Sequence, residues 1–168
     1  TYAEVRYTDI GASVKDLAEG KGIGGELLNQ LSAVDALIHV VRDFNNDSVP
    51  HVDGSLDVGR DIGTMNLELA FSDLTIMERR LERIEASLKA AKPAERQTIM
   101  REQALLEKIK AGLENDIPIR EQDLSPEEIK VINNYQFLTA KPMLIVVNIG
   151  EDRLADSCAL EAKLRAEY

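Results

Sequence analysis

Two short stretches of the sequence have the residue types of a nucleotide site, and the first contains Asp9. It follows strand-like residues 5–8, and open α/β sheets place ligand-binding groups at the carboxyl ends of their strands. A carboxylate there can hold a hydrated Mg²⁺, while backbone N–H groups of the next turn, which contains Gly11 and Ala12, can face a phosphate. An Asp after a strand is also a common turn or cap residue, so the local pattern leaves both interpretations open.

The second stretch follows the apolar run 143–147. The side-chain amide of Asn148 can pair with N7 and the neighbouring exocyclic group of a purine. The carboxylate of Glu151, three residues on, can accept hydrogen bonds from ring or amino N–H groups of the base. Ile149 lies between them in the same stretch. A bare Asn-x-x-Glu is also compatible with an ordinary turn from strand to helix.

The glycine-rich stretch does not form a complete phosphate-binding motif. Gly20, Gly22 and Gly25 match G-x-G-x-x-G, but that motif needs a strand directly before it, and Gly20 comes eleven positions after Asp9. Gly20 and Lys21 resemble the end of a P-loop, but the earlier glycine and the final Ser or Thr are absent. The stretch therefore indicates a glycine-rich entry to a helix, or a switch segment.

The histidines and the cysteine do not indicate a catalytic or metal site. His39 lies within a strand-like run, where a packed core histidine is expected, and His51 lies in a polar loop. Cys158 has no basic neighbour in sequence and is expected to be a small buried residue of a helix. A single cysteine excludes an internal disulfide, and no Cys/His cluster has the spacing of zinc ligands.

Composition narrows the class of protein. The 168 residues include 20 Lys and Arg against 30 Asp and Glu, a net charge of −10. This charge argues against non-specific binding of nucleic acid, apart from a local basic strip such as Arg79, Arg80 and Arg83. No apolar run reaches the roughly 18 residues of a membrane span, and the first residues do not resemble a signal peptide. The composition predicts a soluble protein of a reducing compartment, the cytoplasm.

Strands and helices alternate at both ends of the chain, which predicts an α/β fold. Buried strands are predicted at 5–8, 36–41 and 143–147. The last two are nearly unbroken apolar runs, as in a parallel sheet covered on both faces. Ser125-Pro126-Glu127-Glu128 has the N-cap serine, the proline and the glutamate of a helix start. Helices are predicted at 26–33, 126–134 and 156–167.

The middle of the chain has the period of a coiled coil. Apolar or small residues recur at alternating steps of three and four: Leu67, Ala70, Leu74, Met77, Leu81, Ile84, Leu88 and Ala91. The Lys92-Pro93 step ends this helix. A second helix has apolar residues at Ile99, Leu106, Ile109 and Leu113. The two patterns predict an antiparallel helical hairpin, inserted into the α/β fold over roughly 64–115.

The order of these stretches resembles the YchF-type GTPases and ATPases, a branch of the Obg-related P-loop NTPases. Three stretches are specific: ALIHVVRDF with the following HVDGSLD, the run from LELA to ERRL at 67–81, and FLTAKP at 137–142, which leads to Asn148 and Glu151. The resemblance covers nearly the whole chain. It implies part of the parallel sheet of a P-loop NTPase, interrupted by the antiparallel coiled-coil hairpin.

The resemblance also implies roles for the candidate residues. Asp9 would hold Mg²⁺ through water, and the N–H groups of Gly11 and Ala12 would face the γ-phosphate. The family order is Ala then Gly, and Ala12 lacks the freedom of glycine at positive φ, which weakens the expected γ-phosphate sensing. Glu at the end of the base-reading motif, in place of Asp, favours ATP over GTP. The base contacts would be Asn148, Ile149 and Glu151.

The resemblance implies three parts of the chain: a G-domain part over 1–63, the coiled-coil insertion over 64–115, and a return to the G domain over 116–168. It further implies a P-loop before the first residue and a TGS domain after the last, so the chain alone should not hydrolyse nucleotide. The parent protein would cleave ATP or GTP with Mg²⁺ and associate with the ribosome, without binding membrane or DNA. The alternative is a non-catalytic interaction module that acts through its coiled-coil hairpin.

Overall fold

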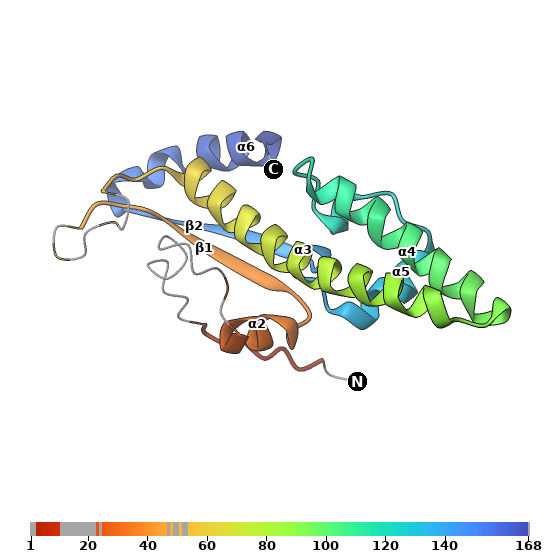
Figure 1. Cartoon of the computed structure of the whole chain (residues 1–168). Helices are drawn as coiled ribbons and strands as arrows, with labels where there is room; N and C mark the ends of the chain where they lie inside the picture. Colours follow the sequence, from red (N-terminus) through yellow and green to blue (C-terminus); the bar gives the residue numbers. More distant parts are fainter. Residues whose placement is uncertain are drawn as a thin grey trace. The chain divides into compact units, whose positions relative to one another are not determined.

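In the computed structural model, which describes residues 3–10, 23, 25–46, 48, 51 and 54–167, helices predominate over a small sheet (Figure 1). The α-helices are α2 (Gly25–Ser32), α3 (Val58–Ala90), α4 (Pro93–Leu113), α5 (Pro126–Ile132) and α6 (Ser157–Glu167). The strands are β1 (Leu37–Asp43) and β2 (Met143–Ile149). Short 3-10 helices are η1 (Ile119–Glu121), η2 (Asn133–Tyr135), η3 (Leu138–Ala140) and η4 (Glu151–Asp156). The predicted mixed α/β class is confirmed.

The chain divides into two compact units, and each unit combines two separate stretches of sequence. The first unit is made of Thr1–Leu37 and Met65–Pro142, and the second of Ile38–Thr64 and Met143–Tyr168. The first unit contains the helical hairpin and its core. The second contains nearly all of the sheet and the turns that follow its strands, where the candidate base-reading residues lie.

The sheet of the second unit consists of β1 and β2, paired in parallel. Each strand alternates between covered and exposed side chains, and the exposed apolar ones are Ile38, Val40, Leu144 and Val146. The prediction of a sheet covered on both faces is therefore wrong for the described residues. The apolar runs predict the strands, but a face of a sheet is covered by elements distant in sequence. None of the described elements covers the face that carries these exposed side chains.

The strand predicted at 5–8 is not formed. Residues 3–10 have no regular secondary structure, and Val5 and Tyr7 are 68% and 78% exposed. A strand is stable only when its backbone groups pair with a neighbouring strand, and neither of the two described strands pairs with this stretch. Asp9 is consequently an exposed residue of an irregular segment and does not stand at the end of a strand.

In the first unit, α3 and α4 form the predicted antiparallel hairpin, joined at Lys92 (Figure 1). Ion pairs link the two helices: Lys110 Nζ lies 3.2 Å from Glu78 Oε1. The seam residues pack into one core, which contains Ala70, Leu74, Met77, Leu81, Ile84 and Leu88 of α3 with Ile99, Leu106, Ile109 and Leu113 of α4. The seam is two residues shorter than predicted, because Leu67 is 48% exposed and Ala91 lies after the end of α3.

Helix α3 begins at Val58, six residues before the predicted start of the hairpin. Asp57 provides the start signal, since its Oδ1 accepts the N–H of Arg60 at 2.9 Å, as an N-cap residue does. The first seven residues of α3, 58–64, belong to the second unit. The spacing of apolar residues marks only the part of a helix that packs against its partner, so it does not predict the first residues of α3.

Helix α5 has the cap that its sequence predicts. The Oγ of Ser125 accepts the N–H of Glu128 at 3.2 Å, and the Glu128 carboxylate accepts the N–H of Ser125 at 2.7 Å. These two bonds form a complete capping box, with proline at the first helical position. The helix ends at Ile132, two residues before the predicted end, and continues as η2.

The stretch 137–142 makes buried contacts within the first unit. Phe137 is buried in the core of the hairpin. The next two residues donate hydrogen bonds to the buried Asp73 of α3. Lys141 Nζ donates to the carbonyl oxygens of Ser32 and Val34, just after α2, and its burial lowers the pKa of the amine. This stretch is therefore held in the first unit by core packing and by buried hydrogen bonds.

The predicted basic strip is altered by an ion pair of Arg80. Its guanidinium donates to both oxygens of Glu102 on α4, at 2.7 and 2.8 Å, and Tyr135 also donates to that carboxylate. The hydrogen bonds from Arg80 hold the pKa of Glu102 below its ordinary value. Arg80 is therefore neutralised within the unit, whereas Arg79 and Arg83 are exposed.

We expect the Glu102→Gln variant to lose less stability on acidification than the wild type. Because the folded pKa of Glu102 lies below its ordinary 4.5, the stabilisation is complete above that value and is lost as the pH falls through the folded pKa. Arg80 is 39% exposed, so the difference amounts to about 1 kcal/mol. Urea unfolding at about pH 6 and pH 3.5 measures it, with the exposed Glu85→Gln as control. Equal acid sensitivity of wild type and Glu102→Gln would contradict the assignment.

Candidate functional site

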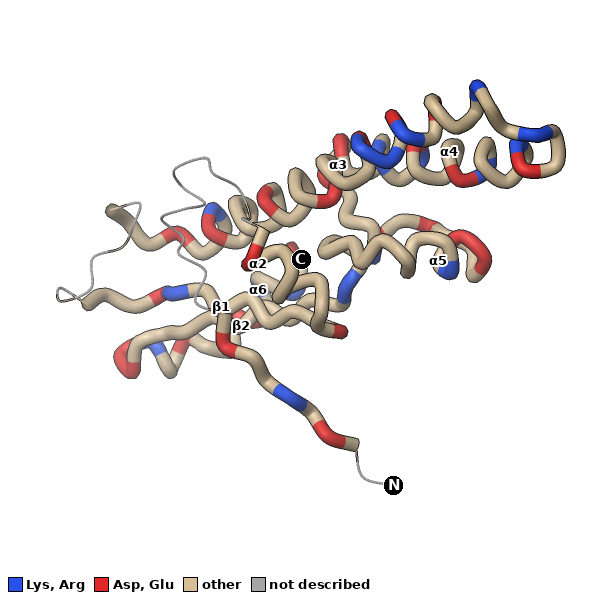
Figure 2. The backbone as a smooth tube through the Cα atoms, turned by 60° about the horizontal axis from the view of Figure 1, so that its bottom comes forward, with Lys and Arg blue, Asp and Glu red and all other residues tan. Residues whose placement is uncertain are grey.

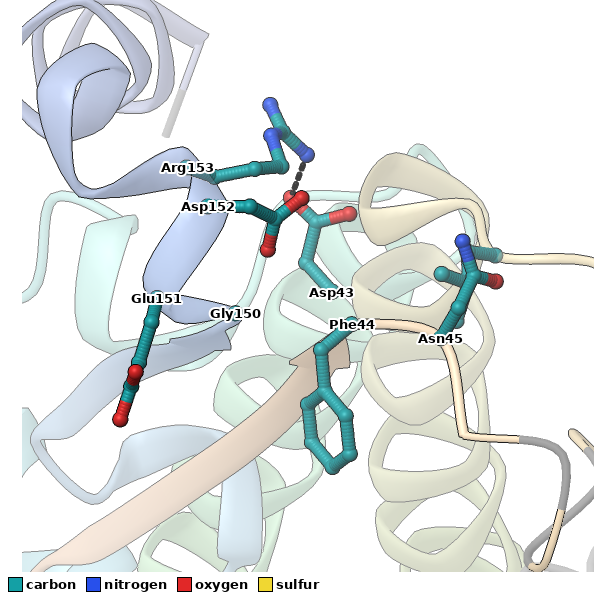
Figure 3. A pocket seen from close by; sticks show the side chains of 8 residues that line it. Asp43, Phe44, Asn45, Gly150, Glu151, Asp152 and Arg153 are labelled. Atoms are coloured by element: carbon teal, nitrogen blue, oxygen red, sulfur yellow. Dashed lines mark hydrogen bonds and ion pairs between the residues drawn. The ribbon is translucent and has the colours of Figure 1, made fainter.

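The second unit contains a pocket of about 390 Å³ at the carboxyl ends of β1 and β2 (Figure 3). Its walls come from the turns after the two strands and from the loop before α3: Asp43, Phe44, Asn45, Leu56, Gly150, Glu151, Asp152 and Arg153. Ligands of open α/β sheets bind at this edge, outside the carboxyl ends of the strands. The pocket therefore has the position of a ligand site.

An ion pair joins the two turns of the pocket. Arg153 of η4 points at Asp43, the last residue of β1, with 2.5 Å between Nη1 and Oδ2 (Figure 3). The Asp43 side chain is only 11% exposed, whereas that of Arg153 is 41% exposed. A nearly buried carboxylate needs a partner, so this pair fixes the turn after β2 against the end of β1.

Gly150 is the first residue of the turn after β2. A Cβ added there would collide with Oδ1 of Asp152 and lie 3.6 Å from the Cβ of Phe44. The carbonyl oxygen of Gly150 also accepts the N–H of Arg153 at 3.0 Å, which begins η4. The colliding oxygen ends a flexible side chain that can rotate away, and the φ of Gly150 is −71°, so neither the space nor the backbone angle requires glycine at this position.

The turn after β1 has its own internal support. Arg42 Nε donates to the carbonyl oxygen of Phe44 at 2.9 Å, and its guanidinium lies over the Phe44 ring, 4.7 Å from the centroid. An arginine over an aromatic face is attracted by the ring electrons. Phe44 thus presents a fixed apolar side chain to the pocket.

The structure places the predicted base-reading residues at this edge of the sheet. Asn148 and Ile149 are the last two residues of β2, which is two residues longer than predicted. Glu151 begins η4 and lines the pocket, with its side chain exposed and pointing away from the ion pair of Asp43 and Arg153 (Figure 3). The three predicted residues therefore lie together at the end of β2 and the start of η4.

Of the predicted phosphate side of the site, the structure describes only Asp9. Asp9 belongs to the first unit and does not line the pocket, while Gly11 and Ala12 fall outside the described residues. Within the part of the chain that the structure describes, no group of three or more His, Cys, Asp or Glu side chains is arranged to hold a metal ion. A single exposed carboxylate such as Asp9 fits a magnesium ion that keeps most of its waters.

Sequence reasoning missed the polar residues that shape the pocket. In the sequence, Asp43 and Phe44 stand out only as part of the stretch ALIHVVRDF, and no motif includes Arg153. The available signal was a charged residue at each side of the sheet edge, Asp at the end of one strand and Arg shortly after the other. Pairing them requires the register of the two strands, which the sequence does not give.

The remaining reactive side chains differ in their surroundings. Burial lowers the pKa of His39, whose Nδ1 is buried without a hydrogen-bond partner among the described residues. His51 Nε2 lies 3.0 Å from Oδ2 of Asp61, near the start of α3. Cys158 is exposed, so the prediction of a buried cysteine is wrong: it lies on α6, which buries none of its residues.

No described helix combines the length and apolarity needed to cross a membrane.

Comparison with known proteins identifies the family. No family model matches the chain. It is 38% identical to the ribosome-binding ATPase YchF of Bacillus subtilis over 96% of the chain and 43% of that protein. It is 37% identical to the Obg-like ATPase 1 of Caenorhabditis elegans over 89% of the chain and 37% of that protein.

A solved structure gives the same result for the fold. The YchF GTPase of Schizosaccharomyces pombe matches 81% of the chain with a TM-score of 0.70 and 35% identity, and the match covers 36% of that protein. The chain thus spans less than half the length of the relatives that it matches. Over the region that it shares with them, the chain belongs to the YchF family.

Proposed function

We propose that the chain is the base-reading and coiled-coil part of a YchF-type nucleotide hydrolase, which cleaves ATP or GTP to the diphosphate and phosphate. One observation supports this most directly: the Asn148-to-Glu151 stretch lies at the carboxyl edge of a parallel sheet, beside a pocket of about 390 Å³. The relatives are named ATPases and a GTPase. Three parts, 1–63, 64–115 and 116–168, would contribute the switch region, the coiled-coil hairpin and the base site.

The proposed chemistry at the base is hydrogen bonding to the purine edge. The Asn148 amide donates to N7 and accepts from an exocyclic amino group, while the Glu151 carboxylate accepts an N–H. Ile149 adds apolar contact. The longer side chain of Glu, compared with the Asp common in GTPases, places its oxygens about one methylene further on. We therefore infer a preference for adenine over guanine.

The proposed phosphate side comprises Asp9, Gly11 and Ala12. Asp9 would hold Mg²⁺ through water, and the two N–H groups of the turn would face the γ-phosphate. The bound magnesium ion would neutralise charge that develops on the phosphate oxygens. None of these residues is proposed as a catalytic acid or base, so hydrolysis would depend on positioning and on the metal.

We further propose that the complete protein associates with the ribosome, as the names of several relatives state for those proteins. Figure 2 shows Lys and Arg interspersed with Asp and Glu along α3 and α4. Arg79 and Arg83 are exposed on this hairpin and could contact phosphates, whereas Arg80 is already paired with Glu102. The hairpin also supports the second candidate function, an interaction module that acts through α3 and α4 without hydrolysis.

Substitution of the base-reading residues tests the proposed function. In the natural protein that contains this chain, Asn148→Ala and Glu151→Ala should each weaken binding of Mg-ATP by about tenfold or more, because each removes a hydrogen bond to the base. Isothermal titration calorimetry measures the Kd. The matched control is Glu161→Ala on α6, which removes an exposed carboxylate that, among the described residues, pairs with Arg165. Unchanged Kd values for both site variants would favour the interaction module.

A further inference from the structure

Helix α2 has little packing of its own within the first unit. None of its eight residues is buried, and its apolar residues Leu27, Leu28 and Leu31 are only half-buried. A helix of this length is unstable by itself in water, because forming its first turn fixes several residues for one hydrogen bond. Contacts with other parts of the unit must therefore hold α2 in place.

Lys141 makes the polar contacts that hold the end of α2. Its Nζ donates to the carbonyl oxygen of Ser32, the last residue of α2, at 3.0 Å and to that of Val34 at 2.5 Å. The last carbonyl groups of a helix have no partner within it, and an ammonium group satisfies them and complements the negative end of the helix dipole. Among the described residues, no other side chain has a recorded hydrogen bond to α2 or to residues 33–36.

The stretch that contains Lys141 is also bonded to α3. Asp73 accepts the N–H of Leu138 at 2.8 Å, and it accepts the N–H and the hydroxyl of Thr139 at 2.8 and 2.7 Å. The carbonyl oxygen of Leu138 in turn accepts the N–H of Lys141 at 3.2 Å, at the end of η3. A chain of hydrogen bonds therefore runs from Asp73 of α3 through η3 and Lys141 to the end of α2.

Both charged groups of this chain are buried, since Asp73 is 0% exposed and Lys141 is 8% exposed. Burial raises the pKa of Asp73, and the charge of Lys141 opposes that shift. Burial lowers the pKa of Lys141, and the charges of Asp35 and Asp73 oppose that shift. Removal of one charge from such a pair leaves the other buried without compensation. The contacts of Lys141 at α2 and those of Asp73 at α3 therefore depend on each other.

We infer that Lys141 is an anchor that couples the local stability of α2 to the hairpin, because it holds the C-terminal end of α2 on a chain of hydrogen bonds that begins at Asp73 of α3. A partner that binds α3 and displaces Asp73 would thereby loosen α2. Lys141 takes no part in a chemical step. The inference concerns the first unit alone, so it goes beyond the proposed function and does not depend on what the pocket of the second unit binds.

Hydrogen exchange of the α2 amides measures this coupling. In the natural protein that contains this chain, exchange over 25–36 is followed by mass spectrometry and expressed relative to exchange over 104–110, in the core of α4. In Lys141→Met, which keeps the aliphatic stem, this relative rate should rise about tenfold or more, because the end of α2 loses two charge-assisted hydrogen bonds. An unchanged relative rate overturns the inference.

Substitution of Asp73 tests the coupling at a distance. Asp73→Asn keeps the size of the side chain and removes its charge, and the relative rate for α2 should rise about fivefold although Asp73 has no recorded bond to α2. In Asp73→Asn/Lys141→Met the rate should stay within about twofold of Lys141→Met, because α2 without its anchor no longer depends on the hairpin. Two independent structural roles would instead multiply to about fiftyfold, and that result overturns the inference.

Two controls and one milder variant complete the test. Lys108→Met removes an exposed lysine that donates to the carbonyl oxygen of Asp123, and Glu102→Gln weakens an ion pair between α3 and α4. Neither should change the relative rate for α2, and an increase as large as that of Lys141→Met in either overturns the inference. If Asp73→Asn does not fold, Thr139→Val decides, since it removes the hydroxyl that donates to Asp73. Faster relative exchange of α2 in that variant supports the inference, and an unchanged rate overturns it.

Discussion

Replacement of Asp73 by alanine is expected to lower the free energy of unfolding by about 3 to 5 kcal/mol. Asp73 is fully buried on α3, and its carboxylate accepts the N–H of Leu138 at 2.8 Å and both the N–H and the hydroxyl of Thr139 at 2.8 and 2.7 Å. Burial raises the pKa of Asp73, while the hydrogen bonds from Thr139 and Leu138 oppose that shift. Alanine would leave these buried donors without an acceptor.

Urea unfolding followed by circular dichroism measures the stability change, and hydrogen exchange of the Leu138 and Thr139 amides reports the local effect. Both amides should exchange faster in Asp73→Ala. The control is Glu82→Ala, an exposed carboxylate on the same helix, which should stay within about 0.5 kcal/mol of the wild type. A loss of less than about 1 kcal/mol in Asp73→Ala would show that the carboxylate is not the acceptor for these groups.

Truncation of Phe137 to alanine is expected to be similarly costly, at about 3 to 5 kcal/mol. The side chain is 1% exposed and lies in the core between α3 and α4. Its ring stacks on that of Tyr135, with 5.1 Å between centroids and 6° between planes. Alanine would remove these contacts and leave a cavity that the surrounding helices fill only in part.

The matched control for Phe137→Ala is Phe71→Ala, because Phe71 lies on α3 and is 59% exposed. That substitution should change the free energy of unfolding by no more than about 0.5 kcal/mol. The conservative Phe137→Leu should fall between the wild type and the alanine variant, since leucine fills part of the same volume. Equal effects of the two alanine variants would contradict the assignment of Phe137 to the core.

Together these two predictions explain a stretch that first suggested the family. FLTAKP at 137–142 ends six positions before Asn148 in the sequence, yet the contacts of its side chains are structural. Phe137 fills the core, Thr139 binds Asp73, and Lys141 binds the carbonyl oxygens after α2. The stretch therefore stabilises the first unit. A family resemblance in sequence thus need not mark chemistry.

Local chemistry made several elements predictable. The capping residues of α5 determine its start, because their hydrogen bonds involve only neighbours in sequence. The seam of α3 and α4 was predictable because one helix face must be apolar wherever two helices pack. The start of α3 is also encoded locally, because the Asp57 carboxylate accepts the N–H of Arg60, three residues on.

Elements that depend on distant partners were predicted less well. The strand expected at 5–8 has suitable residues, but strand formation requires a paired neighbour, which no sequence window contains. The cover on both faces of the sheet and the burial of Cys158 were wrong for the same reason, since both depend on what packs against an element. The neighbouring arginines at 79, 80 and 83 predict a basic strip. The sequence does not show that Arg80 is neutralised by Glu102, because that residue is 22 positions away on another helix.

The sequence by itself determined the helical hairpin, the strands β1 and β2, the family, and the Asn148-to-Glu151 stretch as the candidate base reader. These depend on residue types and on spacing within short windows. Only the tertiary structure decided that Asp73 binds the FLTAKP stretch and that Arg153 binds Asp43 and not Glu151. Each of these contacts joins residues more than sixty positions apart in the sequence. Only the folded chain brings their polar groups to hydrogen-bond distance.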